Sequence, residues 1–111
     1  MSKSKAKGTA FETAVVRFLQ ENGFPYAERA PLAGNKDRGD ITGTPGLVWE
    51  CKNAKTIKLA EWSDETYTEM VNASAKYGIL VIKRPRHGRA ADAYAVLPLS
   101  DLTDLLKEAG Y

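Results

Sequence analysis

The stretch GDITGTPGLVWECK, residues 39–52, decides the fold because two short strand patterns flank a Thr-Pro-Gly turn. Side chains alternate along a strand, so the second strand has an apolar face and a face that carries Glu50 and Lys52. The apolar face comprises Leu47, Trp49 and Cys51. It is expected to pack, while the other face presents a carboxylate beside an ammonium group.

Outward from this stretch, hydrophobic periodicity predicts the other elements. The run ILVIK (79–83) is continuously apolar, as in a buried central strand. The full prediction is a helix over 9–22, strands over 25–30, 38–42 and 46–52, a helix over 63–77, strands over 79–83 and 93–98, and a last helix from the cap Ser100 to Gly110. This α-β-β-β-α-β-β-α order predicts an α/β domain with a mixed central sheet flanked by helices.

The second and last helices are expected to turn apolar stripes toward the sheet. In the second helix the stripe comprises Tyr67, Met70, Val71, Ser74 and Ala75. In the last helix it comprises Leu102, Leu105, Leu106 and Ala109.

Length and composition indicate an ordinary soluble domain. The chain has 111 residues, of which 43% are hydrophobic and 27% are charged. Residues 1–8 are expected to form a flexible basic arm, and 9–111 a single domain. The sequence has no run of about 20 apolar residues and no secretory signal pattern. With its single cysteine, this predicts a cytoplasmic protein in a reducing compartment.

The net charge is only +2, but basic residues gather in two places. The first group is Lys3, Lys5 and Lys7, and the second is Lys83, Arg84, Arg86, His87 and Arg89. Basic patches on a nearly neutral domain favour a polyanionic partner such as nucleic acid. Ordinary solvated loops are the alternative for each patch.

Asp40 and Glu50 are the candidate metal-binding acids. If the loop between their strands has three to five residues, both carboxylates point the same way, whereas a two-residue turn shifts the register and separates them. Converging carboxylates suit Mg²⁺ or Mn²⁺, and Lys52 would lie beside the metal. This chemistry predicts phosphodiester hydrolysis. The alternative is a cross-strand charge network without catalysis.

Glu12 lies at the edge of the apolar stripe of the first helix, where an acid can reach a neighbouring site. The same residue completes a capping box with Thr9, which would give it a purely structural role. The sequence leaves both interpretations open.

In order, Glu12 in KGTAFE, Asp40 in RGDI and Glu50-Cys51-Lys52 in VWECK resemble the PD-(D/E)xK, or restriction-endonuclease-like, nuclease superfamily. Within it, the chain is most similar to archaeal and bacteriophage Holliday junction resolvases. The resemblance implies an α-β-β-β-α-β core plus a C-terminal strand and helix. It also implies Mg²⁺, or Mn²⁺ in its place, held by Asp40, Glu50 and the Cys51 carbonyl, with Lys52 on the water and Glu12 as an accessory acid.

Two positions depart from the family pattern. Gly39 stands where the nominal motif has proline, and the second helix has no glutamine, for which Asn72 is the candidate substitute.

The expected function is a metal-dependent, structure-selective DNA endonuclease, foremost a junction resolvase that acts as a homodimer in recombination and repair. The expected DNA contacts are Lys3, Lys5, Lys7, Arg29, Lys36, Arg38, Lys83, Arg84, Arg86 and Arg89. Two alternatives remain: a nuclease of the same fold acting on nicks, flaps or ends, and a DNA-binding module without catalysis. The C-terminal strand and helix either supply the dimer interface or cap the core of one subunit.

Overall fold

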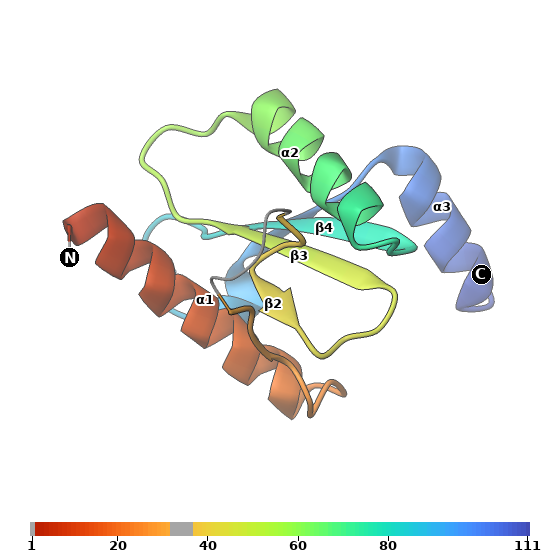
Figure 1. Ribbon diagram of the computed structural model, residues 1–111, viewed down its shortest axis with the longest axis horizontal. Coiled ribbons are helices and arrows are strands. Elements are labelled where there is room, and N and C mark those ends of the chain that lie inside the picture. The colour runs from red at the N-terminus through yellow and green to blue at the C-terminus, as the bar shows by residue number, and fades with distance from the viewer. Residues whose placement is uncertain (1, 32–36) are drawn as a thin grey trace.

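A computed structural model describes residues 2–31 and 37–111, which form an α/β domain in the predicted α-β-β-β-α-β-β-α order (Figure 1). The helices are α1 (Lys3–Glu21), α2 (Leu59–Asn72) and α3 (Leu99–Glu108). The strands are β1 (Glu28–Arg29), β2 (Ile41–Thr42), β3 (Leu47–Lys52), β4 (Tyr77–Ile82) and β5 (Tyr94–Val96), with a 3₁₀ turn η1 (Ala90–Asp92) before β5. Among these residues, no helix is both long and apolar enough to cross a membrane.

The sheet is mixed, as predicted. β4 lies between β3, to which it is parallel, and β5, to which it is antiparallel. All six residues of β4 are buried, which confirms the predicted central strand. β1 and β2 form a separate antiparallel pair, which is joined to β3 where the Asp40 N–H donates to the Trp49 carbonyl over 2.8 Å.

The two faces of the sheet pack against different helices, α1 on one side and α2 on the other (Figure 1). Ile79 and Val81 of β4 join the core on the α1 side, whereas Leu80 and Ile82 pack with Trp62 of α2. Gly78 allows α2 to approach closely, because a Cβ there would lie 3.1 Å from the Thr66 methyl carbon. Glu50 therefore lies on a face that α2 covers.

The first helix begins six residues before the predicted start at Thr9. Ser2 caps it by accepting the Lys5 N–H over 3.1 Å, so the expected arm of residues 1–8 is helical from Lys3 onward. Lysine and alanine favour helices without forming an apolar stripe, so periodicity does not detect these turns. The predicted capping box was wrong, because Thr9 lies inside the helix and its carbonyl accepts the Thr13 hydroxyl.

The second helix also differs from the prediction, both in its limits and in its buried face. It begins at Leu59 rather than Ser63, and Ser74, with φ of 51°, follows its end. Its buried residues are Trp62, Thr66 and Glu69, whereas Tyr67 and Val71 of the predicted stripe are exposed. The face of α2 predicted from apolar content was wrong, because the side of the helix that faces β3 includes Glu65 and Glu69.

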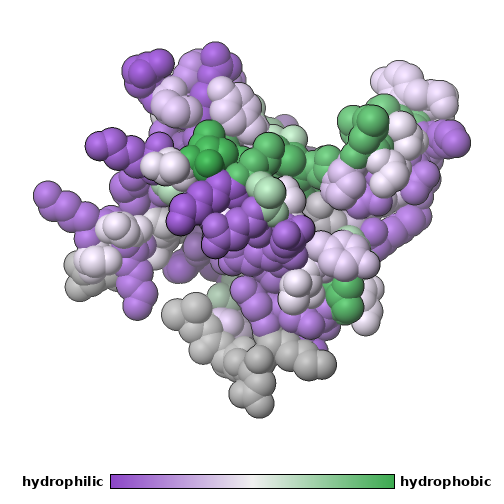
Figure 2. Space-filling view, turned by 90° about the horizontal axis from the view of Figure 1, so that it is seen from above, coloured by the Kyte–Doolittle hydropathy of each residue, from purple (hydrophilic) through white to green (hydrophobic). Residues whose placement is uncertain are grey.

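The last helix packs less than predicted. It begins at Leu99 directly after Pro98, so Ser100 is not its cap, and none of its residues is buried. Its predicted inward leucines are partly exposed, and Figure 2 shows apolar side chains at the right of the view, where α3 lies in Figure 1. Glu108 anchors the helix through an ion pair with Lys76 and a 3.0 Å hydrogen bond from the Tyr77 hydroxyl. Thus β5 completes the sheet, but α3 does not add to the core of the chain.

Candidate metal centre

Four carboxylates meet between β3 and α2. They are Asp37, Glu50, Glu65 and Glu69, and one oxygen from each lies within 4.8 Å of the others. Glu50 comes from β3, Glu65 and Glu69 come from successive turns of α2, and Asp37 precedes β2. Segments far apart in the sequence thus bring four acids to one place.

Asp40 lies at the border of this group and is fixed by the backbone of β3. Its N–H donates to the Trp49 carbonyl, and its Oδ2 accepts the Cys51 N–H over 2.7 Å. Its carboxyl group is near enough to Glu50 to raise the pKa of that residue. Asp40 and Glu50 thus lie close together, as one of the two predicted arrangements required, although β2 pairs with β1 rather than forming a ladder with β3.

Gly39 sets the position of Asp40. Its φ is +95°, and a Cβ there would lie 2.9 Å from the Trp49 carbonyl oxygen. Proline, whose φ is fixed near −65°, cannot adopt this conformation. The departure from the nominal proline thus has a physical cause in the backbone of this chain.

Glu50 and Glu69 are buried carboxyl groups, with 4% and 1% of their surface exposed. Burial, followed by the contacts with Asp40 and Glu69, raises the pKa of Glu50 far above its ordinary value. Burial likewise raises the pKa of Glu69 to about 7, although the side-chain contact with Glu50 opposes the shift. When Glu50 and Glu69 are both ionised, neither oxygen of Glu69 has a hydrogen-bond donor among the described residues.

Lys52 lies beside the four acids at the end of β3. Its Nζ is 3.1 Å from Glu65 Oε2 and lies over the Trp62 ring at 5.7 Å from the centroid. Burial alone would lower the pKa of Lys52, but the hydrogen bond to Glu65 and the nearby Glu50 and Asp40 carboxylates raise it above its ordinary value. The lysine is therefore a cation held by an acid of the cluster.

Glu12 lies on the other side of Asp40, on α1. It accepts hydrogen bonds from Arg29 over 3.1 Å, rather than from the Thr9 backbone. Burial and the neighbouring Asp40 raise the pKa of Glu12, while Arg29 opposes the shift. Glu12 is thus close enough to interact electrostatically with Asp40 but is not one of the four clustered acids. Arg29, a predicted DNA contact, forms an ion pair with Glu12.

Cys51 and Asn72 have supporting positions. Cys51 packs against the core on the α1 side, and burial followed by the Asp40 charge raises the pKa of its thiol. The role of its carbonyl as a metal ligand remains a prediction. Asn72 donates to the Asp37 carbonyl over 2.9 Å, so it holds the segment that carries Asp37 rather than joining the carboxylates.

The predicted DNA-contact residues fall into separate regions. Lys3, Lys5 and Lys7 are exposed on the first turns of α1, and Arg38 is exposed near the acids. Lys83, Arg84, Arg86 and Arg89 lie in the segment between β4 and η1. Lys36 lies outside the described residues.

Three of the four clustered acids were not predicted from the sequence: Asp37, Glu65 and Glu69. Trp62, Thr66 and Glu69 recur at the i, i+4, i+7 spacing of one helix face, which was a detectable signal. The acidic run that contains them resembles an ordinary solvated surface, so it indicated no site.

Comparisons of the chain with protein-family models, curated proteins and solved structures found no match. The chemistry of the site is therefore inferred from side-chain positions. The cluster of acids beside a lysine is the feature that a function must account for.

Proposed function

We propose that this chain is a metal-dependent DNA endonuclease with a restriction-endonuclease-like fold, and that its substrate is a four-way junction. The observation that carries the proposal is the meeting of Glu50, Glu69, Glu65 and Asp37 beside Asp40 and Lys52. Asp40 directly precedes β2, and Glu50 and Lys52 lie on β3 of a mixed sheet between helices, an order that agrees with the family resemblance in the sequence.

The donor set fits a hard divalent cation. When Glu50 and Glu69 are both ionised, their buried charges repel and the Glu69 oxygens have no donor among the described residues, so a cation would relieve both costs. Carboxylate oxygens are the ligands that Mg²⁺ prefers, and Mn²⁺ accepts the same set. Glu50 and Glu69 would hold the ion, with Asp40, Glu65 or Asp37 completing the set.

A bound Mg²⁺ would supply a water of lowered pKa and would neutralise charge on the phosphate. In hydrolysis, the water oxygen bonds to phosphorus while one ester P–O bond breaks. The departing oxygen keeps the electron pair and gains a proton, leaving a phosphomonoester and a hydroxyl group. The Lys52 ammonium group, held by Glu65, is positioned to stabilise negative charge on that phosphate.

A second copy of the chain is the proposed partner, because resolving a junction requires two nicks related by a two-fold axis. Helix α3 offers a surface for pairing, since it exposes apolar side chains and buries none. Asp101 lies in its first turn and Lys107 in its last turn, so antiparallel pairing of two copies places opposite charges together.

Cleavage of a synthetic four-way junction tests this function. With Mg²⁺, wild-type protein is expected to introduce paired symmetric nicks and to spare linear duplex of the same sequence, and EDTA should abolish the reaction. Glu50→Gln should lose cleavage but retain junction binding, whereas Glu28→Gln, an exposed acid of β1, should cleave as wild type does.

The possible outcomes separate the competing functions. Equal cleavage of linear DNA would leave a general nuclease in place of a resolvase. Binding without cleavage under all metal conditions would favour the non-catalytic module.

A further inference from the structure

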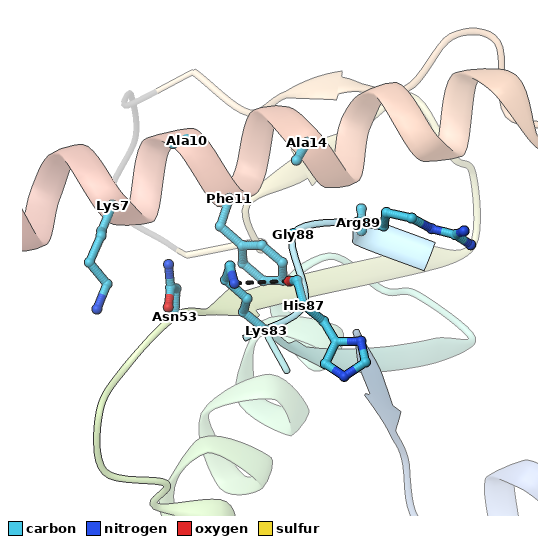
Figure 3. A pocket seen from close by; sticks show the side chains of 10 residues that line it. Lys7, Ala10, Phe11, Ala14, Asn53, Lys83, His87, Gly88 and Arg89 are labelled. Atoms are coloured by element: carbon cyan, nitrogen blue, oxygen red, sulfur yellow. Dashed lines mark hydrogen bonds between the residues drawn. The ribbon is translucent and has the colours of Figure 1, made fainter. Parts of the chain in front are cut away.

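A second candidate site lies on the α1 side of the sheet, in a pocket of about 230 Å³ between α1 and the segment that follows β4 (Figure 3). Its volume is below the roughly 300–1,000 Å³ typical of sites for larger ligands, but it exceeds that of one water, about 30 Å³, several-fold. The lining residues are Lys7, Ala10, Phe11, Ala14, Asn53, Lys83, His87, Gly88, Arg89 and Ala90. The space suits one small group rather than a long ligand.

The lining combines an apolar wall with positive charge. Phe11 extends from α1 toward the segment that carries Lys83 and Gly88, while Lys7 and Asn53 lie at one end (Figure 3). Among the described residues, neither Lys7 nor Lys83 forms an ion pair with a carboxylate. Lys83 donates one hydrogen bond to the His87 carbonyl over 3.0 Å, which leaves further donors on its ammonium group.

The location of the pocket relates it to the candidate metal centre. β3 and β4 are parallel, and Asn53 and Lys83 directly follow their last residues. Ligands of open α/β sheets bind outside the carboxyl ends of parallel strands. Asn53 also directly follows Lys52, so a strand whose phosphate lies at Lys52 could place an adjoining unit in this pocket.

We propose that the pocket binds one nucleotide of a DNA strand, with its phosphate on Lys7 and Lys83 and its sugar and base against Phe11 and the alanines. The choice of DNA rests on the proposed function, whereas the pairing of cations with an apolar wall rests on the pocket itself. The shared chemistry is a phosphate ester that carries a sugar and base, either inside a strand or at its end.

The test is an NMR titration of the full chain in EDTA, where metal binding plays no part. Thymidine 5′-monophosphate is expected to shift the amide signals of Ala10, Asn53 and Gly88 in a saturable manner. Ala10→Leu, which fills the pocket from an exposed helix position, and Lys7→Gln should each weaken binding about tenfold, as expected for loss of a charged hydrogen bond. Arg17→Gln, which replaces an exposed basic residue of the same helix outside the lining, should bind as wild type does.

Three further probes identify the source of the nucleotide. A thymidine dinucleotide without a terminal phosphate should bind if the pocket takes an internal unit, whereas binding of the monophosphate alone would assign it to a strand end. Equal binding of thymidine or of inorganic phosphate would overturn the proposal. So would wild-type affinity in correctly folded Ala10→Leu and Lys7→Gln, and because no cleavage is measured, either failure leaves the nuclease proposal intact.

Discussion

Glu69 is the residue whose environment most directly couples stability to the candidate site. Its pKa is raised from the usual 4.5 to about 7, and Glu50 beside it is raised in the same direction. A carboxyl group with a raised folded-state pKa destabilises the fold as pH rises above its unfolded pKa, because the unfolded state loses its proton first. Glu69 is therefore expected to lower the stability of the metal-free protein between about pH 4.5 and 7, and Glu50 extends the loss to higher pH.

Glu69→Gln should reduce this loss. In EDTA near pH 8, we expect its melting temperature to exceed that of wild type by at least about 4 °C, the shift produced by about 1 kcal/mol in a domain of this size. Glu61→Gln, which replaces an exposed acid on the same helix, is the control and should follow wild type. Equal or lower melting of Glu69→Gln across the whole pH range would contradict the burial of an uncompensated carboxylate.

Gly39 gives a second test at a single position. Gly39→Ala combines a positive φ with a Cβ 2.9 Å from the Trp49 carbonyl oxygen, so we expect a loss of about 2 kcal/mol in the free energy of unfolding. Gly88→Ala is the matched control, because a Cβ there meets no atom within 4 Å among the described residues. Chemical denaturation measures both, and equal stability of the two variants would show that Asp40 is not positioned by this turn.

At the level of elements, a substitution at Gly8 tests whether α1 includes the residues near the start of the chain. Gly8 lies inside the helix, and a Cβ there has no neighbour within 4 Å among the described residues. Gly8→Ala should therefore stabilise the protein by about 0.5–1 kcal/mol and increase the helical signal in circular dichroism.

Gly110 provides the opposite case on α3. It has φ of +98° just after the helix, so Gly110→Ala is expected to destabilise the fold.

The Gly8→Ala variant also defines the result that would contradict a helix beginning at Lys3: no gain in stability and no gain in helical signal.

The sequence predicted the order of elements because local patterns are sufficient for that purpose. The apolar run of β4 could only be buried. The alternation in β3 placed Glu50 on the face opposite Leu47, Trp49 and Cys51, but the expectation that only the apolar face packs was wrong: Val48 and Glu50 are buried, whereas those three residues are half-buried. The meeting of Asp40 and Glu50 was predicted as one of two alternatives, and the two carboxyl groups do lie close together, but β2 pairs with β1 instead of forming the expected ladder with β3.

The orientation of α2 could not be predicted from hydrophobicity alone. Tyr67 and Val71 are more apolar than Thr66 and Glu69, yet Thr66 and Glu69 are the buried pair. The helix face that carries them packs on the sheet, where Gly78 leaves room for Thr66. The buried face contains acids, so local apolar content opposes the tertiary arrangement. The same limitation applies to α3, whose leucines form a stripe that the rest of the subunit does not cover.

For the whole molecule, exposure of the α3 leucines leads to a prediction about assembly. Wild-type protein is expected to sediment as a dimer, and Leu102→Asp combined with Leu106→Asp should yield a monomer. Because neither leucine is buried within one subunit, the variant should keep its fold and its circular dichroism spectrum. The control is Tyr26→Asp, which alters an exposed apolar residue on another part of the chain and should remain dimeric. A wild-type monomer at all concentrations, or a dimer that survives both substitutions, would contradict pairing through α3.

Binding of Mg²⁺ measured by isothermal titration calorimetry tests the central claim most directly, because it requires no assumption about the DNA substrate. The claim is that the acids between β3 and α2, with Glu69 among them, hold a divalent cation. We predict saturable binding to wild-type protein, a loss of at least about tenfold in affinity for Glu69→Gln, and wild-type affinity for Glu61→Gln. Equal affinity of Glu69→Gln and wild type, or no binding to wild type at millimolar Mg²⁺, would contradict the account.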